Sequence, residues 1–103
     1  MPVDRDKEAL VNAMEARLLA GPGTAPPELR SKAFEDRDVP DALAELIGKV
    51  AKRSFRMTDA DFAAPLAAGF TEDQLFELVI CAAAGESSRL YHAGLAALAE
   101  AGG

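Results

Sequence analysis

A single carboxylate lies inside an otherwise apolar segment. Between residues 75 and 84 only Glu77 is polar. A helix that is apolar almost all round is expected to be buried, and a buried carboxylate needs a cation or several hydrogen-bond donors. Arg89 and His92 are candidate partners. Such a pair in a dry pocket could transfer protons in a decarboxylation or an isomerisation. The alternative is a structural ion pair between two helices.

Cations that could receive an anionic ligand occur in two places. Arg89 lies near the start of the last predicted helix, and a stripe of three cations follows one face of an earlier one: Lys49, Arg53 and Arg56. Any of them could partner Glu77 or orient a small carboxylate substrate. The alternative for the stripe is a solvated helix face, where cations near the C-terminus complement the helix dipole.

The one histidine and the one cysteine limit the chemistry further. His92 can exchange protons near neutral pH, but a lone histidine cannot build a conventional metal site. An exposed surface imidazole is its alternative role. No cation or helix N-terminus is near Cys81 to lower its pKa. We therefore predict a buried packing cysteine, with a redox-sensitive thiol as the alternative. One cysteine cannot form an intramolecular disulfide, and we expect neither a metal site nor a cofactor.

Caps and breakers predict the helices that position these groups. Thr71 as N-cap and Gln74 three residues later predict a capping box. Gly85 predicts a break or sharp kink in the apolar run that follows. Apolar spacing and turn residues then give five or six helices, over about 4–20, 28–34, 38–55, 58–68, 71–84 and 89–101.

Composition predicts one all-α domain over residues 1–103 that needs neighbouring copies. The chain is rich in alanine, which favours helix, and poor in β-branched residues. Alanine also supplies 22 of the 51 hydrophobic residues. Because an alanine side chain buries little area, the remaining residues make a small core for a free-standing domain of this length. We therefore expect a homo-oligomer.

Charge and segment composition exclude several classes of protein. The net charge of −6 provides no basic field for nucleic acid. No segment approaches the roughly 18 uninterrupted apolar residues of a membrane span. The N-terminus is charged where a signal peptide would be apolar. These features predict a cytoplasmic protein with no nucleic-acid or membrane partner.

The order of these signals resembles the carboxymuconolactone decarboxylase family, which includes the alkylhydroperoxidase D-like proteins. The segment AAGFTEDQLFEL at 67–78 matches the family's stretch before its core helix, and an Arg-Leu…Gly-Leu helix follows at 89–95. The resemblance covers about residues 41–98. It implies an all-helical subunit that assembles into trimers, hexamers or related homo-oligomers.

The resemblance does not extend to the catalytic groups of the family. Peroxidase members carry a Cys-x-x-Cys and a following histidine, and the matching positions here are Ser54, Met57 and Asp61. Peroxide reduction by a dithiol is therefore not expected. Decarboxylase members use histidine and carboxylate chemistry without a cofactor, but His92 matches no catalytic position of the family.

Two functions of different classes follow, and the sequence does not decide whether the chain is an enzyme. The first is a cofactor-free lyase or isomerase acting on a small anionic molecule, within a homo-oligomer. The second is a non-catalytic oligomeric module that binds a ligand or a partner. A peroxidase-type antioxidant protein is a third. For an enzyme, the candidates are Glu77 and His92 as catalytic residues and Arg53 and Arg89 as substrate-binding residues.

Overall fold

The fold is all-helical, as the sequence predicted. A computed structural model describes residues 5–52 and 58–102, and no strand occurs in that part of the chain. It contains five helices: α1 (Arg5–Ala20), α2 (Pro27–Glu35), α3 (Asp41–Ala51), α4 (Asp59–Ala67) and α5 (Glu72–Gly102). Among these residues, none of the helices combines the length and apolarity needed to cross a bilayer.

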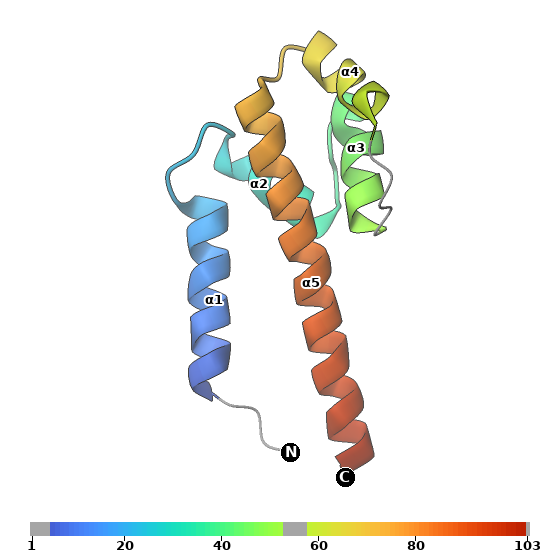
Figure 1. The fold of residues 1–103 in the computed structure, drawn as a ribbon. Coiled ribbons are helices and arrows are strands. Elements are labelled where there is room, and N and C mark those ends of the chain that lie inside the picture. Colours follow the sequence, from blue (N-terminus) through green and yellow to red (C-terminus); the bar gives the residue numbers. More distant parts are fainter. Residues whose placement is uncertain (1–4, 53–57, 103) are drawn as a thin grey trace.

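The long helix α5 is the axis around which the others are arranged. α2 and α3 pack against its N-terminal half, and α4 packs against α3 (Figure 1). α1 runs beside the C-terminal half, and these two segments extend together away from the rest. The molecule is consequently elongated, measuring 51 × 28 × 20 Å. Its radius of gyration of 15.4 Å exceeds the roughly 13 Å expected for a compact chain of this length.

The predicted capping box begins α5. The backbone N–H of Thr71 donates to Oε1 of Gln74 over 2.9 Å, and the N–H of Gln74 donates to Oγ1 of Thr71 over 3.1 Å. Gly69 precedes the box with a φ of 102°, a left-handed conformation that glycine adopts without steric cost. This turn reverses the chain between α4 and α5.

The predicted break at Gly85 is wrong, because α5 continues through this residue without interruption. Gly85 is buried where the C-terminal end of α2 crosses α5. A Cβ atom at residue 85 would overlap the carbonyl oxygen of Phe34 and lie 2.7 Å from its carbonyl carbon. The glycine therefore allows two helix backbones to approach closely. The two helices predicted over 71–84 and 89–101 are therefore one, and the described residues form five helices.

The core lies between α2, α3 and one side of α5. Its fully buried larger side chains include Leu43, Leu46, Ile47, Leu75, Leu78 and Cys81. The opposite side of α5 is open: Phe76 is 67% exposed, and Ile80 is exposed as well. The expectation that this helix would be buried all round is wrong for the single chain, since other helices cover it on one side only.

Replacing Gly85 by alanine should destabilise the fold. The new methyl group meets the backbone of α2, and overpacking of this kind costs about 1–3 kcal/mol. The matched control is Gly48→Ala in α3, where a Cβ atom meets nothing within 4 Å. That change should stabilise the helix by up to about 1 kcal/mol. Urea unfolding followed by circular dichroism measures both. Equal stability of Gly85→Ala and wild type would contradict the close crossing.

Candidate functional site

The carboxylate of Glu77 is bound by the turn that leads into α2. The backbone N–H of Thr24 donates to both carboxylate oxygens, at 2.9 Å for Oε1 and 2.8 Å for Oε2. The Thr24 hydroxyl and the N–H of Ala25 each donate to Oε2 over 2.6 Å. Glu77 is half-buried in this position. Its partners are thus hydrogen-bond donors of a turn, and not the cations of the last predicted helix.

The sequence of the turn explains why a carboxylate fits there. Pro26 and Pro27 have no backbone N–H, and the donors that reach Glu77 come from the two residues before them, Thr24 and Ala25. Gly23 leaves room for the carboxylate, because a Cβ atom at that position would overlap Oε1 of Glu77. An anion is also favourable at the N-terminus of a helix, where the helix dipole is positive.

Arg30 joins the same turn to the end of α1. Its side chain is only 4% exposed. Its Nε donates to the carbonyl oxygen of Ala25 and its Nη1 to that of Leu18, both over 3.0 Å. The guanidinium is therefore engaged with two backbone carbonyls while its charge acts on Glu77. No motif in the sequence points to Arg30 as a residue of this site.

Hydrogen bonding keeps Glu77 ionised. The bond from the Thr24 side chain lowers the pKa of Glu77 most, followed by the backbone N–H groups of Thr24 and Ala25. Partial burial opposes this shift, and the positive charge of Arg30 adds to it. A general acid that works near neutral pH needs a raised pKa. The environment of Glu77 shifts its pKa in the opposite direction.

An open cleft of about 420 Å³ lies beside this carboxylate, between α1 and α5. Arg17, Arg30 and Glu77 supply the charged part of its lining. The remaining lining residues are Met14, Leu18, Pro22, Ile80 and Cys81. Because Glu77 and Arg30 already bond to the fold, the cleft offers a ligand the exposed side chain of Arg17 and otherwise mainly apolar surface.

Cys81 is a buried packing residue, as predicted. Its side chain is inaccessible to solvent in the core cluster. Burial raises the pKa of the Cys81 thiol, and the negative charge of Glu77 acts in the same direction while Arg30 opposes it. A raised pKa and a buried sulfur are the opposite of what a reactive thiol requires.

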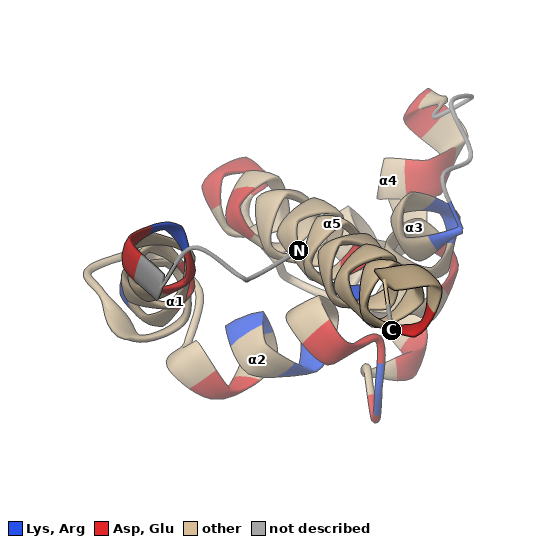
Figure 2. Ribbon diagram, turned by 90° about the horizontal axis from the view of Figure 1, so that it is seen from below, with Lys and Arg blue, Asp and Glu red and all other residues tan. Residues whose placement is uncertain are grey.

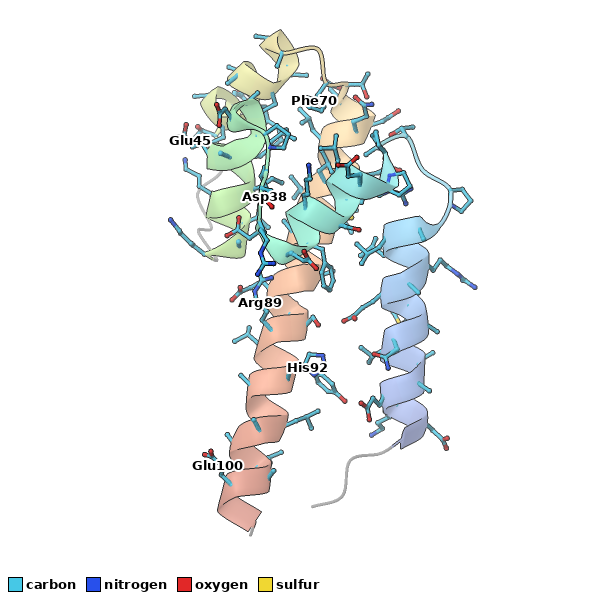
Figure 3. The ribbon with its side chains drawn as sticks, turned by 180° about the vertical axis from the view of Figure 1, so that it is seen from behind. Asp38, Glu45, Phe70, Arg89, His92 and Glu100 are labelled. Carbon is cyan, nitrogen blue, oxygen red and sulfur yellow. The ribbon has the colours of Figure 1, made fainter. Side chains whose placement is uncertain are left out.

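Arg89 and His92 lie far from Glu77 along the same helix. Nη1 of Arg89 donates to the carbonyl oxygen of Phe34 over 2.8 Å, and its Nη2 lies 3.4 Å from Oε2 of Glu86. His92 is exposed, and its ring meets that of the adjacent Tyr91 edge to face at 5.4 Å. At 1.5 Å per residue, about 22 Å of helix separates His92 from Glu77. Figure 3 shows Arg89 near the junction with α2 and His92 further along the projecting part of α5.

The three cations of the predicted stripe are not all free to bind an anionic ligand, because Lys49 already has a partner. Nζ of Lys49 lies 2.6 Å from Oδ1 of Asp61, which is buried. Oδ2 of Asp61 accepts the backbone N–H of Thr58 over 2.8 Å, and these bonds lower the pKa of Asp61. The sequence predicts Thr58 as an N-cap, and the structure confirms a capping box in which Asp61, three residues later, is the second member. Arg53 lies outside the described residues.

The structure therefore does not bring together the three predicted site residues that it describes. Glu77 binds a turn, Arg89 binds the end of α2, and His92 is remote from both. Within residues 5–52 and 58–102, no group of three or more His, Cys, Asp and Glu side chains is arranged to hold a metal ion. No family model, curated protein or solved structure matches the chain.

Replacing Glu77 by glutamine should lower stability at neutral pH, because an amide cannot accept all the bonds that the carboxylate receives. The folded-state pKa of Glu77 is lowered, so its contribution is complete above the unfolded pKa of roughly 4.3. It is lost as the pH falls through the lower folded value. Melting temperatures should differ most at pH 7 and converge towards pH 3.

Glu100→Gln, at the exposed end of α5, is the control and should change little. A Glu77→Gln effect no larger than that of Glu100→Gln would contradict the anchoring role. So would a difference that fails to narrow in acid.

The thiol of Cys81 should react slowly with a thiol-specific dye in the native protein, since reaction requires local opening. In denaturant the rate should rise by orders of magnitude. A cysteine introduced at the exposed Ala99, in a Cys81→Ser background, is the reference for free access. Comparable native rates for the two thiols would show that Cys81 is accessible.

Proposed function

We propose that this chain is a non-catalytic module that assembles into a homo-oligomer, the second of the two functions that the sequence left open. The observation that carries the proposal is an apolar surface on α1 and α5 that the chain does not cover. Six of the seven large exposed hydrophobic side chains among the described residues belong to these two helices: Leu10, Met14, Phe76, Ile80, Leu90 and Leu98.

The uncovered surface includes a groove between the two helices. It has a volume of about 500 Å³, and Val11 and Leu18 of α1 face Ile80 and Tyr91 of α5 across it. Glu15 is the one charged residue in its lining. Figure 2, viewed along the molecule, shows α5 uncharged over most of its length. A wide apolar groove between two projecting helices is a surface that a partner can cover.

The exposed area supports association with further protein. The chain exposes 7000 Å², whereas a folded monomer of this mass exposes about 5,500 Å². The excess of roughly 1,500 Å² is larger than the 800 Å² or so that each partner buries in a standard stable interface. Association of copies through this surface would restore the usual ratio of exposed area to mass.

The geometry gives less support to an enzyme. The hydrogen bonds of Glu77 hold it as a structural anion, and His92 is too distant to share a proton with it. Arg89 is also bound to backbone and to Glu86. The proposal rests on these contacts and on the exposed surface. It does not rest on the family resemblance.

Light scattering after size-exclusion chromatography should give a mass that is a multiple of 10.8 kDa. The melting temperature should rise with protein concentration, because association stabilises the folded subunit by mass action. Wild-type protein at several concentrations, from low to high micromolar, is sufficient. A constant mass of 10.8 kDa with a melting temperature independent of concentration would overturn the proposal.

A further inference from the structure

One face of α5 carries a regular spacing of uncharged residues along most of the helix. Starting at Phe76, these residues follow one another at alternating intervals of four and three and end at Ala101. We call this row the α5 seam; it consists of Phe76, Ile80, Ala83, Ser87, Leu90, Gly94, Ala97 and Ala101. Every one of them is exposed. Alternating steps of three and four are the spacing by which one helix packs along another.

The helices of the same chain leave the residues of the α5 seam exposed. α1 lies along the adjacent side of α5, where Ala84, Ser88 and Tyr91 line the groove between the two helices. Ile80 and Ser87 of the seam form the edge of the same groove. The core covers the side that carries Leu78 and Cys81. α4 approaches only the N-terminal end, near Phe76. A partner helix therefore finds an exposed row along α5 from residue 76 to residue 101, bordered by α1 at Ile80 and Ser87.

We propose that the α5 seam packs against the α5 seam of a second copy, with the two helices antiparallel; this rests on the proposed self-association. The bulky residues lie at the N-terminal end of the seam and the small ones at its C-terminal end. In an antiparallel pair centred between residues 88 and 89, each large side chain meets a small one. The layers are Phe76 with Ala101, Ile80 with Ala97, and Ala83 with Gly94.

The centre of the pair follows the same rule. Ser87 faces Leu90 of the second copy, and Leu90 faces Ser87 in return, so that the contact is isologous. A parallel pair would instead place Phe76 against Phe76 and Gly94 against Gly94. The distance between helix axes depends on the side chains at the contact and is about 8–10 Å. The parallel pair would have to splay at one end, whereas the antiparallel pair has the same combinations of side chains at both ends and therefore the same distance there.

Electrostatics agree with this choice of partner. The seam contains no charged residue although the chain carries a net charge of −6, so the contact buries apolar surface without burying a charge. Antiparallel packing also places the positive N-terminal end of each helix dipole beside the negative C-terminal end of the other. With α1 beside each α5, the product is an antiparallel bundle of four helices.

Disulfide trapping tests the orientation and register. In a Cys81→Ser background, Ile80→Cys and Ala97→Cys chains are prepared separately, then mixed and oxidised mildly. Each chain alone should give little dimer on a non-reducing gel, while the mixture should crosslink. Ala96→Cys mixed with Ile80→Cys is the control, because Ala96 is exposed but lies outside the seam. Circular dichroism confirms that each variant is folded.

The outcomes separate this inference from the proposed function. A disulfide between two Ile80→Cys chains indicates parallel packing and overturns the inference, while self-association stands. Equal crosslinking of Ile80→Cys with either partner overturns the register. An oligomeric mass without a crosslink in any mixture places the interface elsewhere and also overturns it. A monomeric mass overturns both.

A second variant tests the seam without a covalent bond. Gly94→Leu inserts a large side chain opposite Ala83 of the other copy, at two symmetric layers. It should weaken self-association at least about tenfold, since overpacking of one layer costs about 1–3 kcal/mol. Ala96→Leu, two residues along and outside the seam, should leave the dissociation constant unchanged. Equal effects of the two substitutions would contradict the packing.

Discussion

The crossing of α2 over α5 is the contact on which the rest of the structure depends. Glu77 holds the turn at the N-terminal end of α2, and Arg89 bonds to a carbonyl oxygen at its C-terminal end. Gly85 lies between them and admits the backbone of Phe34. An anion at the positive end of the helix dipole and a cation at its negative end are the favourable arrangement. Two residues with the chemistry of an active site thus fix one helix on another.

This crossing also determines which surfaces remain open. It places α2 and α3 on one side of the first half of α5, and the core forms there. The second half of α5 extends past α2 and has α1 beside it (Figure 1). The chain has few large apolar residues, and they are divided between a small core and an exposed surface. The thin core noted in the sequence and the exposed area of the fold have the same origin.

The sequence predicted local features well and distant partners poorly. The capping box at Thr71 and the burial of Cys81 depend on nearby residues and on composition, and both were confirmed. The prediction at Gly85 was wrong because a glycine within a helical segment is compatible with two structures, a helix break and a close crossing of two helices. Only the position of α2 distinguishes the two. The partner of Glu77 is the turn at Thr24, more than fifty residues away. The spacing of charged residues in the sequence does not indicate this contact.

Glu77 shows how a polar residue in an apolar helix can be misinterpreted when its partner is distant in the sequence. A carboxylate among hydrophobic residues attracts a catalytic interpretation, because an unpaired charge there would be costly. In this fold three donor groups of one turn bond to Glu77. These hydrogen bonds offset the free-energy cost of burying the charge, and no substrate is needed. Large apolar side chains on the exposed face of α5, among them Phe76 and Leu90, remain accessible to solvent instead. Function is therefore better sought in what covers that face than in the groups that sequence chemistry singles out.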